Sequence, residues 1–149
     1  MNIKAVQLIT IISLVFSFIS CGDSEEEKAM RKFYLLQDRD DELVGWWEIK
    51  QTEEDAARET RYWEFRINGE LHSHSRRLSD EKLFGQFDEY WYTKGDTLNL
   101  YNYNKGWAYG SWESKRKYAI SQDGNVLFIS TNGLEPELKE WGIRATPQE

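Results

Sequence analysis

The pattern of hydrophobic and polar positions divides this 149-residue chain into three parts. Residues 5–19 form one apolar run, and residues 22–40 are mostly polar. From Leu43 onward, apolar residues recur at every second position, which is the side-chain repeat of a half-buried β-strand. The pattern predicts three units: a leader at residues 1–20, a tether at residues 21–40 and one β-domain at residues 41–149.

The tether contains the only helix that the pattern predicts. Within residues 28–40, Met30, Phe33 and Tyr34 have the i, i+3, i+4 spacing of one helix face. One or two helical turns there would present an apolar face to the domain. Residues 52–60 (TEEDAARET) are interpreted as a polar connection between the first two strands.

Strand periodicity is clearest in residues 61–67, where the apolar set Trp63, Phe65 and Ile67 alternates with polar neighbours. The same reasoning applied along the domain predicts strands at residues 45–51, 61–67, 71–77, 83–93, 97–101, 107–112, 115–120, 125–131 and 138–145.

Turn signals separate these strands at near-hairpin spacing: Asn68-Gly69, Lys94-Gly95-Asp96, Asn104-Lys105-Gly106 and Gln122-Asp123-Gly124. The connections are too short for the crossover helices that parallel strands need, so the sheet should be mostly antiparallel. Eight or nine strands joined in this way predict an all-β fold, a small up-and-down barrel. A two-sheet sandwich is the main alternative, but it usually needs Greek-key crossings.

The leader has the features of an export signal. Lys4 precedes about fifteen mostly apolar residues, fewer than the roughly 20 that a helix needs to span a bilayer. Phe18-Ile19-Ser20-Cys21 resembles a lipobox, although Phe18 departs from the commoner leucine. We expect cleavage before Cys21 and lipidation of its thiol, because two or more acyl chains make attachment stable. The alternative is an uncleaved apolar anchor.

An acidic run, Gly22-Asp23-Ser24-Glu25-Glu26-Glu27, follows the cysteine. It resembles a surface-export signal of one lineage of Gram-negative bacteria, and the alternative is a solvated spacer that like charges extend. Glycine rather than aspartate after Cys21 agrees with sorting to the outer membrane. We therefore expect a lipid-anchored outer-membrane protein, and leave open whether it faces the periplasm or the cell surface.

Charge and cysteine content narrow the partners. The formal net charge is −7, and removing the leader, whose only charged side chain is Lys4, makes it more negative. Nucleic acid binding needs a basic face and is not expected. An anionic lipid surface would repel the domain, so the membrane contact we expect is the lipid on Cys21. Cys21 is the only cysteine, which excludes an internal disulfide.

Leu43-Val44-Gly45-Trp46-Trp47 resembles the Gly-x-Trp opening of lipocalins and of bacterial lipocalin-like domains. Residues 95–100 and 123–129 resemble the hairpin pairs of such lipoproteins, so the similarity covers residues 43–131. In lipocalins the motif Trp packs across the closed barrel end under an Arg from the last strand. The resemblance therefore assigns structural roles to Gly45, Trp47 and Arg144, with a cation–π contact between the last two.

The chain departs from true lipocalins because it is shorter, has no disulfide and has no recognisable long C-terminal helix. These departures argue against a large open calyx. A barrel of this size could be filled by its own side chains.

No catalytic constellation is evident. His72 and His74 would share a strand face, but a metal site needs a third ligand, so we expect no metal and no cofactor. Paired carboxylates for glycoside hydrolysis would have to come from acids that an alternating strand turns outward. These acids are Glu48, Glu64, Asp88 and Glu89. We therefore do not expect an enzyme.

Aromatic residues make up 15% of the chain and suit either core packing or a binding face. They cluster at Trp91, Tyr101, Tyr103, Trp107, Tyr109 and Trp112. The candidates for ligand contact are Trp63, Phe65, Trp91, Leu100, Trp107 and Tyr109.

Two functions follow from these observations. The first is a non-enzymatic binding module for a small apolar or glycan ligand. The second is a structural or interaction lipoprotein that contacts another envelope protein. A void lined by Trp63, Phe65, Trp91 or Leu100 would favour the first, and a filled barrel axis would favour the second.

Overall fold

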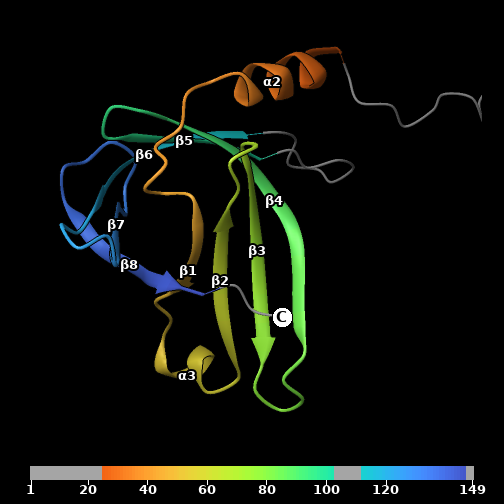
Figure 1. Ribbon diagram of the computed structural model, residues 1–149, viewed down its shortest axis with the longest axis vertical. Helices are drawn as coiled ribbons and strands as arrows, with labels where there is room; N and C mark the ends of the chain where they lie inside the picture. The colour runs from red at the N-terminus through yellow and green to blue at the C-terminus, as the bar shows by residue number, and fades with distance from the viewer. Residues whose placement is uncertain (1–24, 103–111, 147–149) are drawn as a thin grey trace, which may run out of the picture.

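Each strand of the domain pairs antiparallel with its neighbours in sequence, and the last returns to the first, so the sheet closes into a barrel (Figure 1). The computed structural model describes residues 25–102 and 112–146. The strands in this part of the chain are β1 (Gly45–Ile49), β2 (Glu59–Phe65), β3 (Glu70–Arg77), β4 (Leu83–Lys94), β5 (Thr97–Asn102), β6 (Trp112–Ile120), β7 (Val126–Ser130) and β8 (Leu138–Ala145). The predicted up-and-down barrel is confirmed, and the sandwich alternative is excluded.

Three details of the strand prediction are wrong. β6 runs through residues 113–114, where a break between two separate strands was predicted. Residues 103–111 and their predicted turn lie outside the described part of the chain. β1 ends at Ile49, two residues early, because Thr52 already caps a helix. Ile67 lies in the β2–β3 turn and is 64% exposed, not on the inward face of a strand.

The β2–β3 turn explains the position of Ile67. Arg66 N donates to Glu70 O at 2.9 Å, which leaves a three-residue loop, Ile67-Asn68-Gly69. Only Gly69 in this loop has positive φ, at 89°. That is the pattern of a turn followed by a glycine bulge rather than a two-residue hairpin loop. The Asn-Gly signal suggested a two-residue loop, but the loop has three residues and includes Ile67.

A second helix, α3 (Glu53–Ala56), occupies the segment that was interpreted as a polar connection. Thr52 Oγ1 accepts the backbone N–H of Asp55 at 3.3 Å, and the first turn is entirely acidic. Both features stabilise a helix N-terminus. The prediction of a single helix is therefore wrong.

Helix α2 (Glu25–Leu35) packs on the outside of the barrel and is longer than predicted. Tyr34 is buried, stacks on Tyr101 with ring centroids 5.4 Å apart, and donates its hydroxyl to Glu113 at 2.9 Å. Met30 packs on the same cluster, as its spacing indicated, whereas Phe33 is 47% exposed. None of the helices in the described ranges is long and apolar enough to cross a bilayer.

The hydrophobic core fills the part of the barrel where β1 begins. It consists of Leu43, Trp47, Phe65, Leu71, Trp91, Leu98, Leu100, Tyr118, Leu127 and Ile129. The Arg144 guanidinium lies 3.9 Å from the centroid of the Trp47 ring, the contact that the resemblance to lipocalins implies. Arg144 also donates to the carbonyls of Glu42, Val44 and Gly124, which ties β8 to the segments on either side of it. We call this part of the barrel the closed end.

β8 approaches β1 closely because residue 142 has no side chain. A Cβ on Gly142 would lie 2.6 Å from the carbonyl oxygen of Glu48, a backbone atom that cannot move without displacing β1. This contact is at the seam where Glu48 pairs with Ile143 and Ile49 pairs with Gly142. Closure of the sheet therefore depends on glycine at this position.

We predict that Gly142→Ala lowers the free energy of unfolding by about 1–3 kcal/mol, the usual cost of overpacking. Urea unfolding followed by tryptophan fluorescence measures it. The control is Ile143→Ala, at the neighbouring exposed position of β8, where we expect less than about 1 kcal/mol. Equal effects of the two changes would contradict a special role of Gly142 in closure.

Candidate functional site

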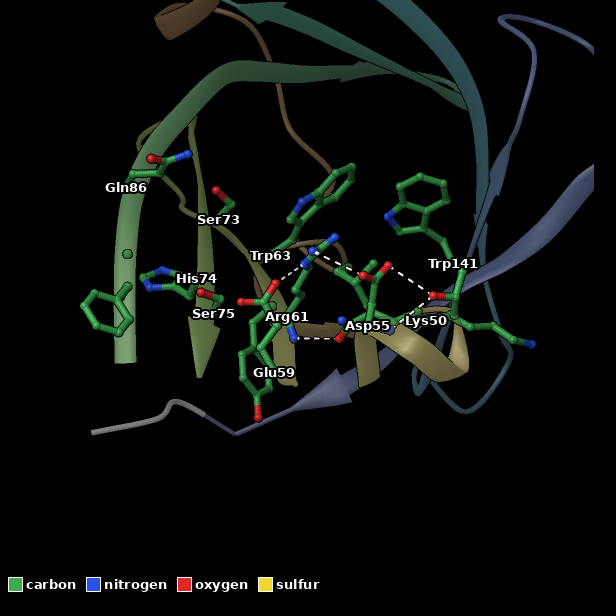
Figure 2. Close-up of a pocket in the computed structure, with 16 residues that line it drawn as sticks. Lys50, Asp55, Glu59, Arg61, Trp63, Ser73, His74, Ser75, Gln86 and Trp141 are labelled. Atoms are coloured by element: carbon green, nitrogen blue, oxygen red, sulfur yellow. Dashed lines mark hydrogen bonds and ion pairs between the residues drawn. The ribbon is translucent and has the colours of Figure 1, made fainter. Parts of the chain in front are cut away.

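A pocket of about 600 Å³ lies at the barrel end next to α3 (Figure 2). It is lined by the end of β1, by α3 and its flanks, by β2, β3 and the start of β4, and by Trp141 of β8. The hydrophobic core ends beneath it. The barrel is therefore filled at its closed end and hollow at the other, which we call the open end.

The pocket has one aromatic wall and one polar wall. Trp63 and Trp141 lie against each other with ring centroids 5.2 Å apart, and Ile49 packs beside them. Ser73 is the cross-strand neighbour of Trp63, and Gln86 is paired with Ser73 on β4, so the polar side chains continue the lining away from Trp141, as Figure 2 shows. A molecule in this space would meet flat apolar surface in one part of the lining and hydroxyl and amide groups in the adjoining part.

Along the paired strands β2 and β3, the pocket lining changes from charged residues at the mouth to apolar residues deeper in the barrel. Glu59 pairs with Arg77 at the mouth, Arg61 with Ser75 below it, and Trp63 with Ser73 deeper in the pocket. The next inward pair in the register is Phe65 with Leu71, and both are fully buried. Because every second residue of a strand faces the lumen, one register produces the whole gradient.

Ion pairs organise the rim. Arg61 Nε donates to Glu59 at 2.6 Å, and an Arg61 amino group lies 4.0 Å from Asp55, as the dashed lines in Figure 2 indicate. The hydrogen bond to Glu59 raises the pKa of Arg61, so this side chain stays charged. The backbone N–H of Arg61 also donates to Gln51 Oε1 at 2.9 Å, which holds Gln51, two residues after β1, against β2.

Two buried donors of pocket residues have no hydrogen-bond partner among the described residues: Gln51 Nε2 and Trp141 Nε1. Unsatisfied buried donors are rare because each costs about 1–3 kcal/mol. Both belong to residues that line the same hollow. Neither donor is exposed to the hollow, so an acceptor would reach it only after a shift of the lining.

The structure separates the predicted ligand candidates. Trp63 lines the pocket, whereas Phe65, Trp91 and Leu100 are buried in the core beneath it and are not in the lining. Trp107 and Tyr109 lie outside the described residues, as does Cys21. The described members of the aromatic cluster also lie apart, because Trp91 is in the core, Tyr101 lies under α2 and Trp112 is 43% exposed.

His72 and His74 share the outer face of β3, as their spacing predicted, and His74 is also among the residues that line the pocket at its edge (Figure 2). The His74 ring stacks on Trp46 at 4.2 Å, and its Nε2 donates to Glu64 at 2.9 Å. His72 Nε2 donates to Glu70 at 3.1 Å. Each imidazole is thus bonded to its own carboxylate. No group of three metal-ligating side chains occurs in residues 25–102 and 112–146.

Three of the four acids considered from sequence, Glu48, Glu64 and Glu89, are not in the lining of the pocket. The strand registers place Glu48 and Glu64 on the outer face with His72 and His74, and Glu89 is buried on β4. The Asp88 side chain lies outside the described part of the structure. The carboxylates that do line the pocket are Asp55 and Glu59, both beside Arg61. Both acids pair with one arginine, which is not the arrangement of two carboxyl groups flanking a scissile bond that glycoside hydrolysis uses.

Most of the lining was missed by the sequence analysis. Gln51, Ser73, Ser75 and Gln86 are polar side chains that face a lumen, and an alternation rule assigns polar residues to the outside. Trp141 was within the predicted closing strand, but a register shift between β7 and β8 changes its neighbours. The only sequence signal for the lining was the two-residue alternation of a strand, which puts residues 59 and 61 on the same face as Trp63.

Comparison with protein-family models, curated proteins and solved structures finds no match to this chain.

The outer-face pair Glu64–His74 predicts a pH dependence of stability. Desolvation raises the pKa of Glu64, but hydrogen bonds with Arg66 and His74 outweigh it, so the pKa lies below its ordinary value. A lowered folded-state pKa stabilises the protein above the unfolded-state value, and that stabilisation is lost as pH falls through the folded-state value.

We therefore expect Glu64→Gln to cost about 1 kcal/mol at pH 7 and much less near pH 3. Chemical unfolding of both proteins across this range measures the difference. Glu135→Gln, at an exposed position of the β7–β8 loop, should show no such trend. A Glu64→Gln cost that stays constant with pH would contradict the assignment.

Proposed function

We propose that this protein is a lipid-anchored, non-enzymatic binding module of the outer membrane that holds a saccharide in the open end of its barrel. The observation that carries the proposal is the pocket of about 600 Å³, with Trp63 and Trp141 in one part of its lining and Ser73 and Gln86 in the adjoining part. Sugar rings have an apolar C–H face and a hydroxyl edge, which match an indole surface and a row of hydrogen-bonding groups.

The polar wall distinguishes between the two ligand classes considered from sequence. A purely apolar ligand would desolvate Ser73, Ser75 and Gln86 without replacing their hydrogen bonds with water, at a cost for each group. A saccharide supplies both donors and acceptors to these side chains.

The alternative, an interaction lipoprotein with a solid barrel, is supported by the closed end, where side chains fill the axis. The open end does not fit it, because a purely structural barrel gains nothing from a hollow lined by polar groups. Anchoring rests on the sequence Phe18-Ile19-Ser20-Cys21. Acyl chains would hold a domain whose net negative charge gives it no attraction to anionic lipid.

Ligand binding is tested by titrating the full-length protein with cellobiose, maltose and N,N′-diacetylchitobiose while recording tryptophan fluorescence. We expect at least one to bind, Gln86→Ala to weaken binding severalfold, and Trp141→Ala to weaken it at least tenfold, which is about 1.4 kcal/mol. The control Trp112→Ala removes an exposed indole outside the pocket and should bind normally.

Binding of a long-chain fatty acid with no response to any saccharide would contradict the saccharide assignment. No response to either class would contradict the binding function itself and favour the interaction role.

Anchoring is tested separately with Cys21→Ala. We expect the variant to lose incorporation of labelled palmitate and to leave the membrane fraction, whereas Ser24→Ala should retain both. Unchanged membrane retention of Cys21→Ala would refute lipid anchoring.

A further inference from the structure

A second hollow of about 710 Å³ adjoins the pocket at the open end of the barrel. Its lining includes Asp55, Glu59 and Arg61, the same three residues that form the rim of the first. The two hollows are therefore neighbours separated by one ion-paired ridge. A ligand that extends out of the pocket over Arg61 enters the second hollow.

Arginine dominates the second hollow. Arg58, Arg61 and Arg77 line it together with two carboxylates, so its lining has a positive formal balance on a chain whose net charge is −7. The remaining lining is small or apolar: Ala57, Leu78 and Ser79. Glu54 and Asp80 pair with Arg58 and Arg77 beside the hollow, so an anion here would be recognised by unused guanidinium N–H donors and not by a net positive charge.

The backbone holds these arginines on one surface. Leu78 N donates to Arg58 O at 3.0 Å, which joins the segment after α3 to the end of β3. Arg77 is paired across the sheet with Glu59, so it lies on the lumen side of β3 at the mouth. Arg58 and Arg77, nineteen positions apart in sequence, are in this way placed around the same hollow.

Each arginine keeps donors that its acidic neighbour does not use. Arg58 contacts Glu54 through one amino group at 2.8 Å, Arg77 contacts Asp80 through one at 3.4 Å, and Arg61 contacts Glu59 through Nε. A guanidinium has five N–H donors in a planar fork, which suits carboxylate, sulfate and phosphate oxygens. Exposed surface ion pairs are also weak, so an incoming anion can compete with them.

We propose that the ligand is an acidic saccharide, with one sugar ring against the two walls of the pocket and an anionic substituent on Arg58, Arg61 and Arg77. This inference rests on the proposed saccharide binding and adds the charge of the ligand to it. The gradient along β2 and β3 matches such a molecule from its ring to its anion. The anion is a carboxylate, a sulfate or a phosphate ester, which share the chemistry that these donors recognise.

The test compares matched probes on the full-length protein: cellobiose, cellobiuronic acid, and cellobiose carrying a 6-sulfate or a 6-phosphate. We expect at least one acidic probe to bind about tenfold more tightly than cellobiose at 20 mM NaCl, as a hydrogen bond to a charged group allows. This advantage should shrink at 500 mM NaCl because the rim is exposed to screening ions. The acidic probe with the highest affinity identifies the anion.

Variants assign the effect to the hollow. Arg77→Gln and Arg58→Gln should each weaken binding of the acidic probe about fivefold to tenfold and leave cellobiose unchanged. Both side chains are largely exposed, so folding should tolerate the changes. The control Arg31→Gln removes the same charge from α2, where the side chain lies over Tyr90, and should affect neither probe.

Equal binding of neutral and acidic probes, or an equal loss in Arg31→Gln, would overturn the inference and leave saccharide binding intact. Failure of every saccharide, neutral or acidic, would instead overturn the proposed function. The two failures are thus distinguishable in one experiment.

Discussion

The contact between β1 and β8 determines the rest of this structure. A single sheet becomes a barrel only where Gly142 lets one backbone lie against the other, and Arg144, two residues later, then covers Trp47 and bonds to carbonyls on both sides of the seam. Without closure there would be two edge strands and no enclosed space. Both the packed core and the pocket exist because the sheet has no edges.

The interior is divided along its axis. At the closed end, large side chains from β1 to β7 fill the space, and at the open end small serines on β3 leave it empty beside Trp63. Side-chain size explains this division, because Ser73 and Ser75 occupy lumen positions where Leu71, two residues earlier, contributes to the core. One strand thus contributes both to stability and to a binding space.

The fold was largely predictable from the sequence, and the site was not. Alternation identified Trp63 and Phe65 as inward residues, and the glycine turns at positions 95 and 124 divided the strands, because both signals are local. The pocket lining depends on which polar residues face the lumen, and Ser73 or Gln86 looks the same in a sequence whether it faces in or out. Trp141 depends on a register shift between β7 and β8, which is decided by three-dimensional pairing.

β4 links the two ends of the molecule. α2 packs on its later part through Tyr90 and Tyr92, and the pocket wall includes its beginning at Phe84 and Gln86. Figure 1 accordingly shows α2 and α3 at opposite extremes of the barrel. A surface that holds the chain upstream of α2 would therefore lie at the end of the barrel away from the open end. Long or branched molecules could enter and leave without steric conflict with that surface, so attachment and exchange would be independent of each other.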